Sequence, residues 1–498
     1  MPKHYTYFFL FLLFSSVKSQ EKRTFSPGTG NGLLQVYQNP ALLSGGPIKV
    51  DVIYSGMAFN YQNSWFGVKK SSLGPNFSIT QPASYQPDSS WGNTAPGTAA
   101  NVFKNLVFFD AASPKISFQS RIYMPSFMVN ITRDQTIFFT WSVRTNFSIT
   151  GVNRKMTEFF KSEFDLSVTQ NNPLKGGVLA ASYQTWAEYG CGWAGKIYQK
   201  GHHTLRGGVT VKMLQGLQAA EAMLDGVDML FSNKDTMSYV KTKLHYAVST
   251  NTGPEDFKNL GSLYHRVAKP SLGFDFGVVY EWRKEVKNAK GKSSIPRVFE
   301  QAAKFRGSLA LTDIGGMKFE KEGIYYDLDV NLNNTGLNSY NNAKNFKQVD
   351  SLIRLNYNSV GQSGTFRMAL PAALNIQADY VLRGGWHAAL MMKFAGLRKA
   401  NTFQVRDFTT ITVLPGYEHK WFEFSVPLSY NTVSGGAGRY VLYGLSTRLG
   451  PVAIGFPDIG AFTLSDIRSL QGYIVFKSPI YYRKVKPKSR NGKDKNKY

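Results

Sequence analysis

The chain has almost no cysteine: only one of its 498 residues is a cysteine, Cys191. An intrachain disulfide is therefore excluded, and with it the small disulfide-rich class. The surrounding segment, Tyr189-Gly190-Cys191-Gly192-Trp193, offers no cationic neighbour that would favour a reactive thiolate. We interpret Cys191 as a packed strand residue rather than a nucleophile.

Long apolar runs and charged residues are both scarce. Beyond the first residues, no stretch reaches the roughly 18 uninterrupted apolar residues that a spanning helix needs, and the mean hydropathy is -0.25. Charged residues make up 18% of the chain and aromatic residues 14%, whereas soluble domains average about a quarter charged residues. A β-barrel in a membrane explains both observations, because its apolar residues occupy every second position.

Acidic residues are few, 32 against 58 lysines and arginines, which gives a formal net charge of +26. Part of the excess lies in a basic tail over residues 483–498, whose cations are Arg483, Lys484, Lys486, Lys488, Arg490, Lys493, Lys495 and Lys497. Such a run is usually solvated. Because the chain carries an export signal, we expect no nucleic-acid partner; anionic lipid headgroups, peptidoglycan or a periplasmic or secretion-machinery protein fit the tail better.

The export signal lies at the N-terminus. Lys3 and His4 precede a short apolar core from Tyr7 to Phe14, and Val17-Lys18-Ser19 suits cleavage before Gln20. Residues 1–19 are therefore predicted to be a signal peptide, and the absence of a cysteine near the cleavage point excludes a lipoprotein anchor. Export together with membrane-barrel composition predicts the outer membrane of a Gram-negative bacterium.

Strict alternation of apolar and polar residues recurs along the chain. In 421–430 one face holds Phe422, Phe424, Val426, Leu428 and Tyr430, and the other holds Glu423, Ser425 and Ser429. Similar segments are 115–123, 137–149, 187–198, 204–213, 239–248, 274–283, 304–312, 324–332, 374–380, 386–394, 407–417, 439–448 and 471–482. A soluble β-sandwich also alternates, but strand lengths of about 9–12 residues favour tilted spanning strands. We predict an all-β, antiparallel transmembrane barrel of about 14 strands, with a range of about 12–16.

The rest of the chain is assigned around that barrel. Residues 20–113 are predicted to hold a first strand and a long loop or inward-folded hatch, because 21–47 and 58–113 are rich in Gly, Pro, Ser and Asn. Residues 114–482 form the main barrel and 483–498 the basic tail. Helical spacing in 153–162, 213–225 and 346–356 predicts short helices in loops.

The sequence shows no phosphate-binding loop, zinc-ligand spacing or serine-hydrolase elbow. We therefore predict no enzyme activity, no catalytic residue, no cofactor and no metal site. Charged residues on the polar faces of the strands are predicted to line the lumen: Arg144, Asp275, Glu281, Asp327, Asp329, Asp379 and Glu423. For the Asp327–Asp329 pair, lumen lining is favoured over a calcium site.

A signature near the predicted mature N-terminus is Asn39-Pro40-Ala41, within Gln38-Asn39-Pro40-Ala41-Leu42-Leu43. It is followed in order by Gly207-Gly208-Val209-Thr210, Leu414-Pro415-Gly416-Tyr417 and Leu449-Gly450-Pro451. With these motifs the chain resembles an uncharacterised Bacteroidota-type barrel family, distantly similar to FadL-like and PorV-like outer-membrane barrels. A departure from the pattern is the basic tail, because many barrels end on a terminal aromatic strand; Tyr481-Tyr482 is the candidate for that role here.

The resemblance implies a function without assigning any residue a chemical role. FadL relatives move hydrophobic molecules, and PorV relatives carry secreted proteins. The implied role is therefore transport or secretion of a hydrophobic or amphipathic ligand or an exported protein, with outer-membrane lipid around the barrel. The alternative is a non-transporting scaffold that holds cell wall or secretion and motility machinery through its basic tail.

Overall fold

The computed structural model describes eighteen stretches of the chain. These are residues 29–69, 106–109, 114–161, 173–233, 236–249, 269–283, 286–287, 293–294, 303–319, 324–336, 351, 362–363, 365–382, 385–398, 403–419, 422–432, 440–463 and 466–482.

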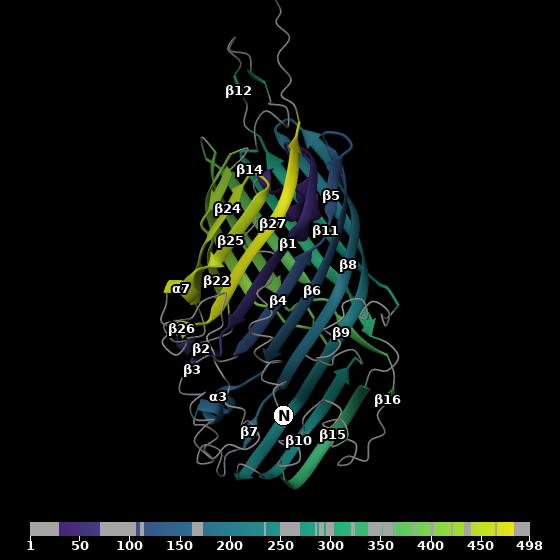
Figure 1. The fold of residues 1–498 in the computed structure, drawn as a ribbon, viewed down its shortest axis with the longest axis vertical. Coiled ribbons are helices and arrows are strands. Elements are labelled where there is room, and N and C mark those ends of the chain that lie inside the picture. The colour runs from purple at the N-terminus through teal and green to yellow at the C-terminus, as the bar shows by residue number, and fades with distance from the viewer. Residues whose placement is uncertain are drawn as a thin grey trace, which may run out of the picture.

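The described strands close into a ring of fourteen antiparallel positions (Figure 1). In ring order they are β1 (Ile48–Asn63), β4 (Lys115–Tyr123) continued by β5 (Ser126–Asn130), β6 (Gln135–Thr150), β8 (Val178–Lys200), β9 (His203–Asn233), β11 (Ser271–Trp282), β14 (Phe305–Phe319), β18 (Ala373–Val381), β19 (Trp386–Ala395), β20 (Thr409–Glu418), β21 (Phe422–Ser425) continued by β22 (Leu428–Thr432), β23 (Tyr440–Tyr443) continued by β24 (Leu445–Leu449), β25 (Val452–Asp458) and β27 (Ser469–Tyr481). The ring closes where Ile48 of β1 pairs with Tyr481 of β27. The predicted fold and strand number are confirmed.

Smaller elements lie around and inside the ring. They are η1 (Thr29–Tyr37), η2 (Pro40–Leu43), β2 (Phe66–Lys69), β3 (Leu106–Phe108), α3 (Arg154–Lys161), β7 (Leu174–Lys175), β10 (Thr236–Val248), β12 (Val286–Lys287), β13 (Ser293–Ser294), β15 (Ile324–Gly336), β16 (Gln362–Ser363), β17 (Phe366–Ala369), α7 (Gly460–Thr463) and β26 (Asp466–Ile467). Helix α3 occupies the predicted helical segment 153–162.

Membership of the ring differs from the prediction at two positions. Segments 239–248 and 324–332 are strands, β10 and β15, but they form an extension beyond the ring, in which β10 pairs with β15 on one side and with the far half of β9 on the other. The ring instead contains β25 and also β1, the first strand expected within residues 20–113; β1 includes residues 58–63, which were expected to be loop. Alternation marks any strand with one buried face, so it cannot separate ring strands from an extension.

The helix predicted over 213–225 is wrong, because this segment lies inside β9, which is 31 residues long. β9 pairs with β11 as far as Leu214 and with β10 from Ala220 onward. A bulge opposite Thr185 and Trp186 shifts the register at that point, so the apolar residues lose their spacing of two and imitate a helix. Of the predicted helix 346–356, only residue 351 lies within the described part of the chain.

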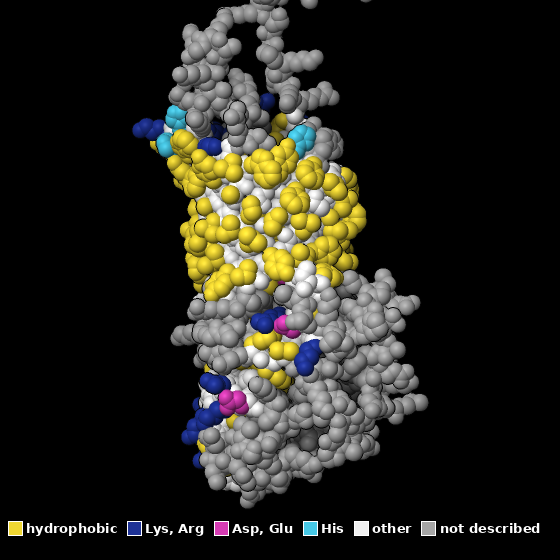
Figure 2. Space-filling view, turned by 90° about the vertical axis from the view of Figure 1, so that its left-hand side faces the viewer, with side chains coloured by type: hydrophobic (Ala, Val, Ile, Leu, Met, Phe, Trp, Pro, Cys, Tyr) yellow, Lys and Arg dark blue, Asp and Glu magenta, His cyan; other side chains and the backbone are white. Residues whose placement is uncertain are grey.

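An apolar belt surrounds the ring and is visible as a band on the face shown in Figure 2, with histidine and cationic side chains at its edge. Its most exposed members include Phe127, Ile137, Trp193, Leu205, Val211, Met213, Leu272, Phe276, Val278, Leu309, Val413, Leu428, Leu445 and Phe476. Inward residues on the same strands are polar and buried, for example in β6, where burial alternates residue by residue. This is the surface of a membrane-spanning barrel of the outer-membrane type.

The two ends of the ring are unequal. At the end where β1 begins and β27 ends, four connections between strands are short: 131–134, 201–202, 382–385 and 450–451. Another connection at that end, 283–304, is longer. The opposite end carries the long connections 64–114, 151–177 and 320–365. Short turns face the periplasm in barrels of this type, so we call the first the periplasmic end and the second the extracellular end. Within the described residues no helix is long and apolar enough to cross a bilayer.

Candidate functional site

The chain segment before β1 lies inside the ring. Asn39 precedes η2 and caps it, because its Oδ1 accepts a hydrogen bond from the Ala41 amide at 2.9 Å. Its Nδ2 donates to two carbonyl oxygens of the barrel wall, those of Val278 at 3.1 Å and Leu309 at 3.2 Å. Pro40 occupies the first helical position, where its missing N–H costs nothing. The signature therefore turns the chain sharply and fastens it to β11 and β14.

Two glycines of the wall make room for this segment. Gly208 of β9 and Gly277 of β11 are register partners. A Cβ at position 208 would overlap the Ala41 amide nitrogen, and a Cβ at 277 would overlap the Asn39 amide oxygen. The paired glycines form a notch, and η2 rests in it. We call residues 29–47 the plug and this notch the plug seat.

Two further contacts hold the plug at its ends. Asp51 of β1 accepts hydrogen bonds from the Leu33 amide at 2.9 Å and from the Lys477 ammonium at 3.0 Å. At the other side, the Arg206 guanidinium lies against Gly45, which has a φ of +78°, and donates to the Ser44 hydroxyl at 3.4 Å. The plug is thus attached to the wall by hydrogen bonds and packing, which can be broken and re-formed.

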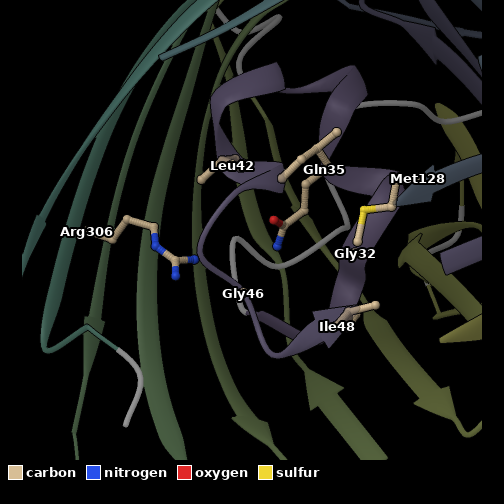
Figure 3. Close-up of a pocket in the computed structure, with 8 residues that line it drawn as sticks. Gly32, Gln35, Leu42, Gly46, Ile48, Met128 and Arg306 are labelled. Carbon is tan, nitrogen blue, oxygen red and sulfur yellow. The ribbon is translucent and has the colours of Figure 1, made fainter. Parts of the chain in front are cut away.

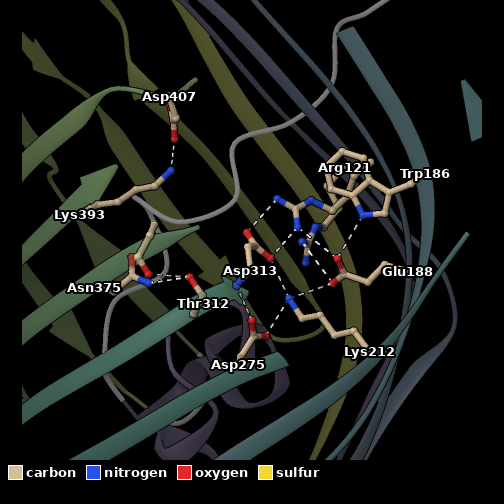
Figure 4. A network of polar contacts seen from close by, with 12 residues as sticks. Arg121, Trp186, Glu188, Lys212, Asp275, Thr312, Asp313, Asn375, Lys393 and Asp407 are labelled. Atoms are coloured by element: carbon tan, nitrogen blue, oxygen red, sulfur yellow. Dashed lines mark hydrogen bonds and ion pairs between the residues drawn. The ribbon is translucent and has the colours of Figure 1, made fainter. Parts of the chain in front are cut away.

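A buried charge network crosses six neighbouring ring positions beside the plug (Figure 4). Its members are Arg121, Arg144, Glu188, Lys212, Asp275 and Asp313. Arg144 donates to Asp313 at 2.9 and 3.2 Å and to Glu188 at 3.1 Å. Lys212 Nζ lies 2.8 Å from both Asp275 and Asp313. Three cations face three anions, so the network is neutral and its members compensate one another's burial.

Asp313 occupies a special backbone position within β14. Its φ is +60°, the sole positive value among the described non-glycine residues, and Gly315 two residues later has a φ of +141°. The Asp313 amide donates to Asp275 at 2.7 Å. This bend separates the two halves of β14: 305–312 pair with β18 in the ring, whereas 316–319 pair with β17.

Beyond the bend, on the extracellular side of the charge network, apolar side chains pack together. They form a cluster, which we call the mouth cluster, made of Trp186, Leu214, Ala219, Ala247, Met317, Phe319, Phe366, Met368 and Leu370, with Phe403 packed against it. The Arg144 guanidinium lies 4.6 Å from the Trp186 ring centre. The mouth cluster therefore adjoins the charge network directly.

A second set of charges lies nearer the periplasmic end. Glu281 is approached by three guanidinium groups, those of Arg206 at 3.1 Å, Arg283 at 2.9 Å and Arg306 at 3.3 Å. Arg306 also borders a cavity of about 10 Å³ between plug and wall, which Gly46 and Gln35 line as well (Figure 3). That volume holds about one water molecule. The plug and the wall thus fit closely at this level.

The structure places the predicted lumen residues as follows. Arg144, Asp275, Glu281, Asp379 and Glu423 are all buried inside the ring. Asp379 contacts His387 at 3.3 Å, and Glu423 contacts Arg448 at 3.5 Å. Asp327 and Asp329 lie on β15, outside the ring, opposite His245 and Lys243, and their side chains fall outside the described set. The basic tail also lies outside the described residues.

Four network members were missed at the sequence level: Arg121, Glu188, Lys212 and Asp313. In the sequence, the available sign of each was a charged residue flanked by residues that favour a strand. The charges meet because neighbouring strands bring them to one height, and that register is absent from any single segment. Among the described residues, no three His, Cys, Asp or Glu side chains are grouped as metal ligands.

The sequence matches a protein family over residues 40–455, which is most of the chain. That family is DUF5723, a family of unknown function. The chain belongs to it. No curated protein matches this DUF5723 barrel.

Solved structures similar to the DUF5723 barrel include the toluene transporter TodX of Pseudomonas putida, with 9% identity, a TM-score of 0.37, and coverage of 94% of this chain and 97% of TodX. A FadL homologue of Pseudomonas aeruginosa has 10% identity, a TM-score of 0.38 and coverages of 92% and 98%. The toluene transporter TbuX of Ralstonia pickettii has 8% identity, a TM-score of 0.31 and coverages of 91% and 95%. At these values the fold assignment rests on the strand pairing itself.

Proposed function

We propose that this barrel resides in the outer membrane of a Gram-negative bacterium and passes a hydrophobic or amphipathic compound across it. The observation that carries the proposal is the seated plug. A chain segment inside the ring is held by hydrogen bonds to wall carbonyls, by a glycine notch and by an apolar core that it shares with the wall. All of these contacts are non-covalent, so the segment is removable, whereas a barrel that only anchors other proteins needs no lumen to open.

The mouth cluster supports the same function. Its buried side chains pack together toward the extracellular end, next to a charged level of the lumen. If these side chains separate, a compound with an apolar part gains free energy by leaving water for them, at about 25 cal/mol per Å² buried. Entry at the mouth followed by displacement of the plug is the route that these elements suggest.

Uptake by intact cells tests the proposal. A Gram-negative host that produces the barrel should take up a tritiated apolar probe such as 1-octanol faster than the same host without it. Equal uptake by both hosts would contradict a transport role. A barrel with a charged residue in the plug seat, Gly277→Glu, reports whether the lumen itself is the route.

One observation favours a second candidate function. The last described residue, Tyr482, donates its amide to the Pro47 carbonyl at 3.1 Å and its hydroxyl to the Thr132 carbonyl at 3.4 Å. The described chain therefore ends at the periplasmic end, and in this second proposal the basic tail 483–498 binds peptidoglycan or a secretion-machinery protein. The predicted signal peptide and the PorV-like relationship belong to this proposal. The scaffold function predicts that deletion of 483–498 releases a co-purifying partner or peptidoglycan; unchanged retention of both would refute it.

A further inference from the structure

One stretch of the inner wall near the extracellular end carries polar side chains whose hydrogen bonds are unmet. Ser117 of β4, Asn146 of β6, Gln184 of β8 and Glu221 of β9 are each at least 98% buried. The Ser117 hydroxyl, the Asn146 Nδ2 and both polar atoms of the Gln184 amide have no hydrogen-bond partner, and the Glu221 carboxyl lies with them beside the Ser182 hydroxyl. A buried polar atom left without a partner costs about 1–3 kcal/mol, so three such residues in one place require an explanation.

These residues are neighbours in the sheet. Asn146 is the register partner of Gln184, and Glu221 is the partner of Ser182, two residues along β8 from Gln184. Ser117 is the partner of Ser148, two residues along β6 from Asn146. Side chains two residues apart on a strand share a face. The four therefore form one continuous patch, which we call the wall patch.

The segment 403–408 lies over the wall patch. The Arg406 amide donates to the Ser148 hydroxyl at 2.9 Å, and the Arg406 guanidinium donates to Thr150 at 3.2 Å. The Lys115 ammonium donates to the Asp407 carbonyl at 2.8 Å. These bonds hold the segment to the neighbours of the patch while leaving the patch atoms themselves unused, as expected of a cover rather than of a permanent packing partner.

The wall patch also borders the mouth cluster. Trp186 follows Gln184 by two residues on the inner face of β8, and Ala219 of β9 is the register partner of Gln184. Phe403, at the start of the covering segment, packs against the same cluster. Apolar and hydrogen-bonding surface therefore meet beneath 403–408.

The charges around the patch restrict what can bind. Arg406, which acts on Glu221 electrostatically, disfavours a cationic group. A carboxylate head only accepts hydrogen bonds, so it would leave the Gln184 Oε1 unmet, and burial penalises its charge. The remaining atoms of the patch are amide and hydroxyl groups, which both donate and accept. A neutral head group that bears hydroxyl or amide groups complements them best.

We infer that the wall patch and the mouth cluster together form an occluded binding site for an amphipathic compound with an uncharged, hydroxyl- or amide-bearing head, and that movement of 403–408 exposes it. The inference rests on the proposed transport function and names its substrate class. The head would satisfy Gln184, Asn146 and Ser117, and the apolar tail would lie against Trp186 and Leu214.

Equilibrium binding to the full-length barrel in nanodiscs tests the head-group preference, with empty nanodiscs subtracted. The probes are radiolabelled 1-octanoylglycerol, octanoate and octylammonium, which share a tail and differ in head charge. We expect 1-octanoylglycerol to bind at least about tenfold more tightly than either ion, as one well-made buried hydrogen bond allows. No binding of 1-octanoylglycerol, or equal or tighter binding of octanoate, overturns the inference.

A matched pair of variants tests the patch itself. Gln184→Leu removes an amide with unmet bonds, whereas Gln62→Leu removes an equally buried, inward amide that donates to Asn60 at 2.8 Å and accepts from Asn431 at 3.0 Å. Gln184→Leu should weaken 1-octanoylglycerol binding about tenfold and raise the thermal midpoint of the empty barrel; Gln62→Leu should leave binding unchanged and lower the midpoint. Unchanged binding in Gln184→Leu, or a midpoint lowered as in Gln62→Leu, contradicts the site.

A disulfide between cysteines introduced by Ser148→Cys and Arg406→Cys, with Cys191→Ser, tests the cover. The oxidised protein should not bind 1-octanoylglycerol, and dithiothreitol should restore binding; binding by the fully oxidised form refutes occlusion by 403–408.

The outcome of the uptake experiment in cells is independent of the outcome of the binding experiments. Specific binding without any uptake would reject transport and keep the site, whereas uptake that Gln184→Leu leaves unchanged, with unchanged binding, would reject the site and keep transport.

Discussion

Gly277 of the barrel wall lies directly under Asn39 of the plug, so close that a methyl group at position 277 would overlap the Asn39 amide oxygen. The same amide side chain donates to the carbonyls of Val278 and Leu309. The plug is therefore positioned by the absence of a side chain in the wall as much as by the bonds it makes.

Gly277→Ala should displace η2 from the plug seat and open a path for ions. Planar-bilayer recordings should show a higher mean conductance for this variant than for the unchanged barrel. Gly46→Ala is the matched control, because Gly46 lies in the plug and a Cβ there meets no atom within 4 Å. Identical conductance in all three proteins would show that the plug tolerates the methyl group without leaving its seat.

Asp313→Asn should destabilise the barrel strongly. The substitution keeps the size of the side chain and its tolerance of a positive φ, but leaves Arg144 and Lys212 with less buried negative charge. Breaking a buried pair costs roughly 3–5 kcal/mol, measurable by urea unfolding in lipid vesicles. Glu158→Gln, which breaks the exposed Arg154–Glu158 pair, should cost under about 1 kcal/mol. Similar midpoints for the two variants would exclude a stabilising role for the network.

Glu221 should make stability depend on pH. It lies beyond Met213, the last belt residue of β9, and burial raises the pKa of its carboxyl from 4.5 to about 8, against the lowering effects of the Ser182 hydroxyl and of Arg406. The folded state thus keeps a proton that the unfolded state releases, so stability is highest below about pH 4.5 and falls as the pH rises toward 8.

Glu221→Gln replaces the titratable carboxyl with an amide and should therefore flatten the curve of thermal midpoint against pH. The variant and the unchanged barrel should agree at pH 4 and diverge at pH 8, where the variant is more stable. Parallel curves across this range would contradict the raised pKa of Glu221.

Cys191 offers a test of the depth of β8 in the bilayer. It is a strand residue as expected, but it is exposed on the outer face of β8 rather than packed, between Phe139 of β6 and Val211 of β9. A nitroxide attached there and reconstituted in lipid should be relaxed by oxygen, which partitions into the bilayer, and not by a water-soluble nickel chelate. Strong relaxation by the chelate would place this level of β8 outside the membrane.

Much of the barrel follows from local sequence. Residues such as Phe422, Phe424 and Leu428 alternate with polar residues whichever strand lies beside them. Alternation of this kind therefore predicts strand positions such as 115–123 and 137–149 almost residue by residue. The polar inward faces also place Arg144, Asp275 and Glu281 inside the ring. Alternation did not distinguish β10 and β15 from the strands of the ring, because these two strands also bury one face.

The sequence by itself determined an alternating, membrane-spanning antiparallel barrel, because side-chain periodicity acts over a few residues, and it marked Asn39-Pro40-Ala41 as a signature. Only the tertiary structure decided that this signature forms a turn, where the turn binds, which six charges meet, and that 403–408 covers the wall patch. Each of those features joins residues separated by up to several hundred positions, such as Asn39 and Leu309. They depend on the register and closure of the ring, and a single sequence carries no local mark of either.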